Sequence, residues 1–148
     1  MFVWIENTTL AIWVGTSLWT YPFLLSLHIV GLAIVAGIFS MRDIHLIGLI
    51  NALPISQFTY LRKLAYIGFI LNTISGFLLF TSQASIFITS GPFLSKISFI
   101  ITAMILTFYI HRKIDNGNNN AELKILAFMS LTCWISAIIA GRLIAYVF

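Results

Sequence analysis

The sequence contains four apolar stretches, each about as long as a helix that crosses a lipid bilayer. They cover roughly residues 23–48, 62–81, 93–111 and 123–147 of the 148-residue chain. A bilayer core of about 30 Å needs about 20 predominantly apolar residues in a helix. Proline is favoured at the start of a helix, and Pro22 and Pro92 precede the first and third stretches. These stretches predict four membrane-spanning helices.

The low content of charged residues supports this interpretation. Hydrophobic residues make up 60% of the chain and charged residues 8%, whereas a soluble domain carries about 25% charged residues. A small soluble domain leaves much of its surface exposed, so it needs charged side chains there. The composition therefore excludes a soluble enzyme, a nucleic-acid-binding domain and a disordered tail. We expect the lipid bilayer, and no nucleic acid, as a partner.

The connections after the first and third stretches carry most of the basic residues. These are Arg42, Arg62, Lys63, Arg112, Lys113 and Lys124. Cytoplasmic loops of membrane proteins carry an excess of Lys and Arg, so these two connections are expected to face the cytoplasm. The sequence thus predicts a multi-pass protein of the bacterial inner membrane with both termini in the periplasm.

The N-terminal segment does not have the pattern of a signal peptide, because it has no basic residues before its apolar part. Its Trp4, Trp13, Trp19 and Tyr21 are typical of an aromatic belt at a membrane surface. Residues 8–19 therefore predict a short interfacial helix. The predicted fold class is all-α: an integral membrane four-helix bundle with this short helix, in a single domain of residues 1–148.

Small residues recur at helical spacing in three of the predicted spans. They are Gly68, Asn72 and Gly76 in the second span, Ala33 and Gly37 in the first, and Ala137 and Gly141 in the fourth. Small residues let membrane helices approach closely, and an amide such as that of Asn72 can bond to a neighbouring helix.

Three ionisable residues lie at a similar depth on the predicted periplasmic side. His28, Lys96 and Arg142 come from the first, third and fourth spans. Ionisable side chains at membrane depth are candidates for function, and two cations beside a histidine suit a carboxylate, haem propionates or a carbonyl oxygen. Alternatively, Lys96 and Arg142 reach to the lipid headgroups, and His28 bonds to a nearby carbonyl or hydroxyl.

His45 and His111 lie at a similar depth on the predicted cytoplasmic side, at the ends of the first and third spans. Their imidazoles could share a metal or a haem iron. The alternative is an ordinary membrane-surface position, with Asp43 paired to Arg62 or Arg112. The chain has three histidines in all, so a pair of haems with two histidine ligands each is excluded.

The motifs, taken in order, resemble a small four-helix bacterial inner-membrane family of unknown function. The matching positions span about residues 22–146. They are Pro22, His28 and Gly31; residues 43–48; residues 53–56; Gly68 and Phe69; residues 76–80; residues 91–96; His111; and Trp134, Gly141, Arg142 and Tyr146. In helical layout this family is distantly similar to membrane cytochromes b and to copper-resistance-type membrane proteins.

The chain departs from that family's pattern at two positions. Leu25 stands where an acidic residue is common, and His45 stands where an arginine is common. The resemblance therefore implies that His45 is not a shared ligand. It favours His28, Lys96, His111 and Arg142 as the cofactor-binding residues, with His28 and His111 as metal ligands.

Three functions follow as hypotheses. The first is a cytochrome-b-like protein associated with haem b or quinone in electron transfer. The second is a non-catalytic accessory or scaffold subunit, as a homo-oligomer or within a larger membrane complex. The third is copper handling by His28 with methionines, although Met1, Met41, Met104 and Met129 do not share its depth. The motifs of soluble enzymes are missing, no catalytic residue is predicted, and enzymatic activity stays open.

Overall fold

The computed structural model of the chain describes residues 2–50, 54–117 and 121–147, and their secondary structure is helical. Three helices are short: α1 (Val3–Glu6), α2 (Thr9–Thr16) and α5 (Ala84–Thr89). Four are long: α3 (Thr20–Ile47), α4 (Ile55–Ser82), α6 (Gly91–Asp115) and α7 (Ala121–Val147). The predicted all-α fold class is confirmed. The one short helix predicted over residues 8–19 corresponds to α2, and α1 precedes it.

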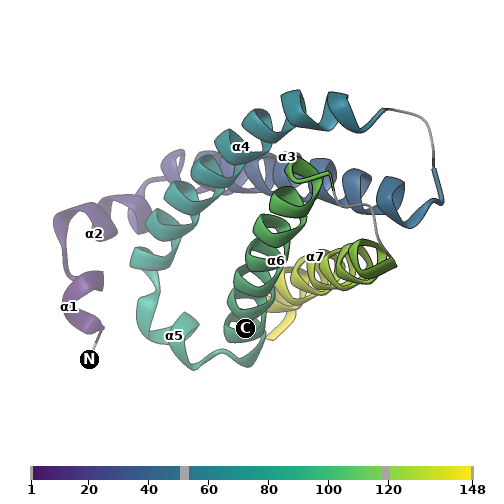
Figure 1. Cartoon of the computed structure of the whole chain (residues 1–148). Coiled ribbons are helices and arrows are strands. Elements are labelled where there is room, and N and C mark those ends of the chain that lie inside the picture. The colour runs from purple at the N-terminus through teal and green to yellow at the C-terminus, as the bar shows by residue number, and fades with distance from the viewer. Residues whose placement is uncertain (1, 51–53, 118–120, 148) are drawn as a thin grey trace.

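The four long helices pack as a bundle in which α3 lies between α4 and α7, and α6 packs against α7. Figure 1 shows α1 and α2 leading into α3, and α5 linking the end of α4 to the start of α6. The central core joins residues of all four long helices, including Phe39, Ala65, Ala103 and Trp134, which are fully buried.

All four long helices extend beyond the apolar stretches that predicted them, and α4 and α6 extend furthest. Helix α4 begins at Ile55 rather than near residue 62, and α6 continues to Asp115 rather than ending near residue 111. The apolar pattern marks only the part of a helix that matches the bilayer core, whereas backbone hydrogen bonds continue through polar residues outside it. Helix α3 ends at Ile47, and the next residue, Gly48, has a left-handed φ of 91° that favours glycine.

All four long helices are long and apolar enough to cross a membrane. Their outer faces carry large apolar side chains: Ile101, Ile105 and Phe108 of α6 are 54%, 54% and 60% exposed. Apolar surface of this extent suits lipid rather than water. The chain is a multi-pass membrane protein with four candidate spans.

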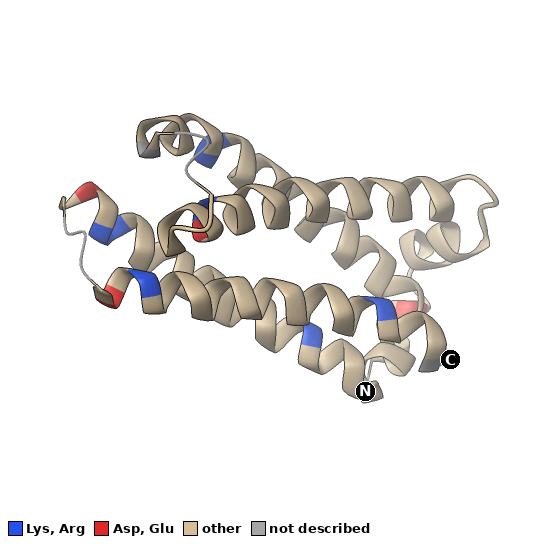
Figure 2. Cartoon of the chain, turned by 90° about the vertical axis from the view of Figure 1, so that its right-hand side faces the viewer, with Lys and Arg blue, Asp and Glu red and all other residues tan. Residues whose placement is uncertain are grey.

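Most charged residues gather at one end of the bundle, and both chain ends lie towards the other (Figure 2). We call the first end the basic end, defined by Arg42, Arg62 and Lys113, and the second the terminal end. This arrangement agrees with the predicted asymmetry of the connections.

Helices α3 and α4 approach closely where glycines meet. A Cβ atom on Gly31 would lie 2.8 Å from the backbone nitrogen of Asn72 and 2.9 Å from the carbonyl oxygen of Gly68. The predicted role of the small residues on α4 in close packing is therefore confirmed at Gly68. Gly37 of α3 is different: it is exposed, and a Cβ there would meet nothing within 4 Å.

Candidate functional site

At the terminal end, His28 of α3 and Lys96 of α6 contact each other. Lys96 Nζ lies 3.2 Å from His28 Nε2, and His28 Nδ1 lies 3.0 Å from the carbonyl oxygen of Asn72 on α4. A carbonyl oxygen only accepts hydrogen bonds, so Nδ1 carries the proton and donates it. His28 is therefore a neutral imidazole whose Nε2 accepts a hydrogen bond from Lys96.

Glycines provide the space for both side chains. The His28 ring lies against Gly76, where a Cβ would come 2.8 Å from His28 Cε1. The stem of Lys96 crosses Gly141 of α7, where a Cβ would lie 3.4 Å from both Cδ and Cε. Among the residues described, no carboxylate forms an ion pair with Lys96. The pair is thus a half-buried cationic donor held in place by a neutral histidine.

Three stacked phenylalanine rings lie close to this pair in the fold. Phe93 packs against Phe80 and Phe87 with ring centroids 5.6 and 5.4 Å apart. Phe93 lies one helical turn before Lys96, and Phe80 one turn after Gly76. The rings therefore form an aromatic cluster about one turn from the His28–Lys96 pair, towards the terminal end.

Arg142, the third residue predicted at this level, points elsewhere. It is exposed, and its guanidinium lies 5.8 Å from the centre of the Tyr146 ring. Its neighbour Gly141 contacts Lys96, and successive helical residues lie about 100° apart around the axis. The structure brings His28 and Lys96 together, whereas a binding role for Arg142 stays a prediction.

At the basic end, His111 of α6 is held by two side chains. Arg42 Nη1 lies 3.0 Å from His111 Nε2, and the Tyr66 hydroxyl lies 3.4 Å from His111 Nδ1. A guanidinium only donates hydrogen bonds, so Nε2 accepts and the proton of the imidazole lies on Nδ1. Both His28 and His111 thus donate from Nδ1 to a group on α4 and accept at Nε2 from a basic side chain.

Arg42 and Asp43 form a buried ion pair beside His111. Their side chains are 2% and 0% exposed, and Arg42 Nε lies 2.9 Å from Asp43 Oδ1. The expectation that Asp43 pairs with Arg62 or Arg112 is wrong, because Asp43 pairs with its neighbour in sequence. Arg62 instead pairs with Asp115 at 3.1 Å, on the surface.

Several uncharged members of this network were missed by the sequence reasoning, which considered only ionisable groups at this depth. The Arg42 guanidinium lies over the Phe39 ring, 5.1 Å from its centre. In this region, Asp43 Oδ2, Ser130 Oγ and Trp134 Nε1 are among the buried atoms that have no hydrogen-bond partner in the described part of the chain. Ser130 and Trp134 lie one turn apart on α7, a spacing that signals a shared face.

His45 has contacts separate from those of His111. Its Nδ1 lies 3.0 Å from the carbonyl oxygen of Ile50, and its ring centre lies 5.4 Å from that of Phe58. His111 instead contacts Arg42 and Tyr66. Among the described residues, His45 and His111 share no hydrogen-bond partner. A metal or haem iron bound by both histidines stays a prediction.

The arrangement of the histidines bears on the haem prediction. His28 and His111 belong to opposite ends of the bundle, since 15 residues separate Lys96 from His111, or about 22 Å along α6. A haem ligand must offer an unprotonated ring nitrogen to the iron. In both histidines that nitrogen is Nε2, which accepts a hydrogen bond from Lys96 or Arg42. As arranged, these residues do not fit an axial haem ligand unless the cation moves away.

The described residues, as arranged, do not fit a copper site either. Within the described part of the chain, no three His, Cys, Asp or Glu side chains gather as ligands for one metal. Met41 and Met129 are 51% and 48% exposed, while His28 contacts Lys96 and Asn72. Met1 lies outside the described residues.

The chain matches no protein-family profile, no curated protein and no solved structure. The class of protein is therefore described from the fold alone. It is a membrane protein with four candidate spans and a polar cluster at each end of its bundle. The resemblance to the four-helix inner-membrane family stays a prediction.

Proposed function

We propose that the chain binds a lipid-soluble quinone at the His28–Lys96 pair and takes part in membrane electron transfer. The observation that carries this proposal is the position of Lys96. Its ammonium group lies in a membrane-spanning helix, 3.2 Å from a neutral histidine, and forms no ion pair with a described carboxylate.

An ammonium group has three N–H donors, and the bond to His28 uses one of them. The others suit an acceptor that arrives from the lipid. A quinone offers two carbonyl oxygens and no net charge, so it enters a membrane site more easily than an anion does. The redox chemistry belongs to the quinone itself, and the protein supplies binding and orientation.

The phenylalanine cluster supports the same ligand. Planar rings stack on aromatic side chains in offset arrangements, and Phe93 lies one turn from Lys96 on the same helix. A quinone ring packed on this cluster would place a carbonyl oxygen near the Lys96 ammonium. With the basic end in the cytoplasm of a bacterium, the site would lie on the periplasmic side of the inner membrane.

Replacing Lys96 with Met is expected to weaken quinone binding about tenfold or more, because a hydrogen bond from a charged donor is lost while the apolar stem is kept. Binding would be measured by titrating a short-chain ubiquinone into protein in phosphatidylcholine nanodiscs and following tryptophan fluorescence. Lys63→Met serves as the matched control, since Lys63 is exposed on α4 near the basic end.

Equal quinone affinity in wild type, Lys96→Met and Lys63→Met would reject this site. A haem found in the purified protein would instead favour the cytochrome-b-like hypothesis, with Lys96 displaced from His28.

A non-catalytic subunit role is the second candidate, favoured by the outer surface of α4. Ile67, Ile70, Ile74 and Phe77 are 62%, 57%, 57% and 61% exposed and follow helical spacing. A partner helix or a second copy of the chain could cover this stripe as well as lipid does. Co-purification with one partner in fixed ratio, without quinone binding, would favour this role.

A further inference from the structure

A second polar site lies at the terminal end, apart from the His28–Lys96 pair. An open pocket of about 470 Å³, which we call the cavity, lies between α1, α2, the start of α3 and the end of α4. This volume is within the range of about 300–1,000 Å³ typical of small-molecule sites. Glu6, Thr16, Tyr21, Ser82 and Gln83 are among the residues that line it.

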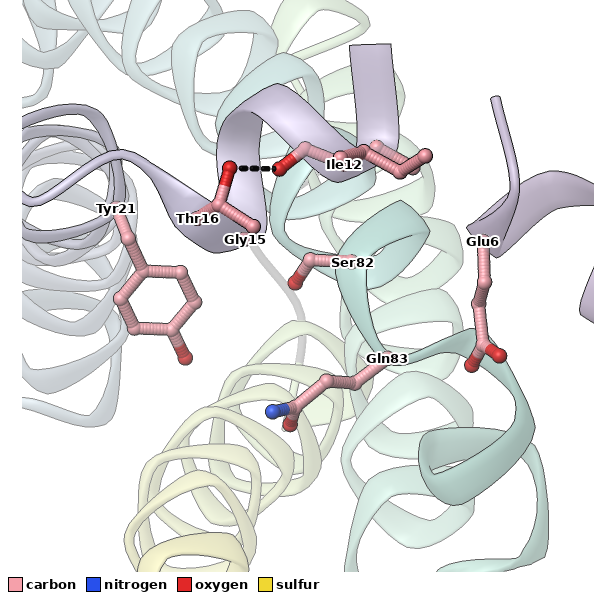
Figure 3. Close-up of a pocket in the computed structure, with 8 residues that line it drawn as sticks. Glu6, Ile12, Gly15, Thr16, Tyr21, Ser82 and Gln83 are labelled. Atoms are coloured by element: carbon pink, nitrogen blue, oxygen red, sulfur yellow. Dashed lines mark hydrogen bonds between the residues drawn. The ribbon is translucent and has the colours of Figure 1, made fainter. Parts of the chain in front are cut away.

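Figure 3 shows how these side chains are arranged. Ser82 and Gln83 project from the end of α4 on the side of Tyr21, and Glu6 reaches down from α1 on the other side of Gln83. The cavity is therefore bounded by polar groups from four helices, α1 to α4.

Two hydroxyl groups of this cavity, those of Thr16 and Ser82, are oriented to accept hydrogen bonds. Thr16 Oγ1 donates its proton to the carbonyl oxygen of Ile12 at 2.6 Å, and Ser82 Oγ donates to that of Leu79 at 2.7 Å. A hydroxyl has one proton to donate, and in both residues that proton is already donated to a carbonyl oxygen. Each hydroxyl oxygen therefore offers a ligand its lone pairs, which accept hydrogen bonds.

The charged residue that lines the cavity is the anion Glu6, and its negative charge suits a cationic ligand. Glu6 Oε1 accepts a hydrogen bond from the Ser85 backbone N–H at 2.7 Å, which orients the carboxylate. In the part of the chain that the structure describes, Glu6 forms no ion pair, and no Lys, Arg or His lines the cavity. A carboxylate and several acceptor oxygens without a cation form a site for a cationic donor.

We propose that this cavity binds a primary ammonium group, borne either by the headgroup of phosphatidylethanolamine or by a free small amine. A primary ammonium has three donors and no acceptor, which complements the Glu6 carboxylate and the lone pairs of the Thr16 and Ser82 hydroxyls. A quaternary ammonium carries the same charge but has no N–H to donate. The chemistry therefore distinguishes ethanolamine from choline.

The test compares the two headgroups in both forms. A ligand that binds only the folded protein raises its unfolding temperature. Wild type in phosphatidylcholine nanodiscs would be titrated with ethanolamine or with choline, and separate nanodiscs would contain phosphatidylethanolamine. We expect stabilisation by ethanolamine, by phosphatidylethanolamine, or by both, and none by choline. The arm that stabilises identifies the source of the ammonium group.

Two variants test whether the stabilising ligand binds in this cavity. Glu6→Gln keeps a carbonyl oxygen for the Ser85 N–H and removes the charge, so the ethanolamine or lipid concentration for half-saturation should rise about tenfold or more. Gly15→Leu would fill the cavity, since a Cβ at Gly15 meets only Ser82 Cβ, at 3.5 Å. Glu122→Gln, at the basic end, is the matched control for charge.

Three results would overturn the proposal. They are the absence of stabilisation in every arm, equal stabilisation by choline and ethanolamine, and full stabilisation retained in both Glu6→Gln and Gly15→Leu. If Glu6→Gln fails to fold, Gly15→Leu alone decides the matter, because Gly15→Ala is expected to fold and bind normally as its control.

Discussion

Replacing Arg42 with Met is expected to destabilise the folded protein by about 3–5 kcal/mol, because it leaves the Asp43 carboxylate buried without a cation. Asp43 is 0% exposed, and its Oδ2 already has no hydrogen-bond partner among the described residues. The bond from Arg42 to His111 is lost as well. Asp43→Asn should have a similar cost, since it leaves the Arg42 guanidinium without its carboxylate.

The double variant Arg42→Met/Asp43→Asn tests whether the loss of stability comes from an unpaired buried charge or from lost packing contacts. It leaves no unpaired buried charge, so it should be more stable than either single variant. Unfolding would be followed by circular dichroism of the protein in mixed micelles, as denaturing detergent is added. Arg62→Met is the control, because it breaks an exposed ion pair, which contributes little. A loss for Arg42→Met no larger than for Arg62→Met would contradict this account of the basic end.

Replacing Gly31 with Ala should destabilise the bundle by about 1–3 kcal/mol, because the added methyl group has no space. Its Cβ would lie under 3 Å from two backbone atoms of α4, the nitrogen of Asn72 and the carbonyl oxygen of Gly68. Backbone cannot rotate away as a flexible side chain does, so α3 and α4 would have to separate. This movement would also carry the Asn72 carbonyl away from His28 Nδ1, and quinone binding should weaken with it.

Gly37→Ala is the matched control on the same helix. A Cβ at Gly37 meets nothing within 4 Å, and alanine favours a helix over glycine by up to about 1 kcal/mol. The control should therefore be neutral or slightly stabilising in the same unfolding assay. If the two variants were equally stable, the close approach of α3 and α4 at Gly31 would be wrong.

The membrane-spanning helices could be predicted from the sequence because hydropathy and length are local properties. Helix ends were less predictable, since Ile55 and Asp115 lie in polar surroundings where hydropathy no longer follows the helix. The depth of His28 and Lys96 also followed from the rise of about 1.5 Å per residue, and the two side chains do meet.

The rotation of each helix about its axis could not be predicted. Arg142 lies at the expected depth, yet Gly141 rather than Arg142 faces Lys96. The predicted partner of Asp43 was also wrong: Arg62 pairs with Asp115 on the next long helix, and Asp43 pairs with Arg42. The contacts of Gly141 with Lys96 and of Arg62 with Asp115 depend on how the helices pack against one another, which no single span encodes.

The reduced-minus-oxidised absorption spectrum of the purified protein, prepared with its native lipids, tests the central claim most directly. We predict the ultraviolet change of a quinone that becomes a quinol, weakened in Lys96→Met and unchanged in Lys63→Met, without the bands of a b-type haem. A b-type haem spectrum that disappears in His28→Ala would contradict the account, because His28 Nε2 would then bind iron instead of accepting a hydrogen bond from Lys96.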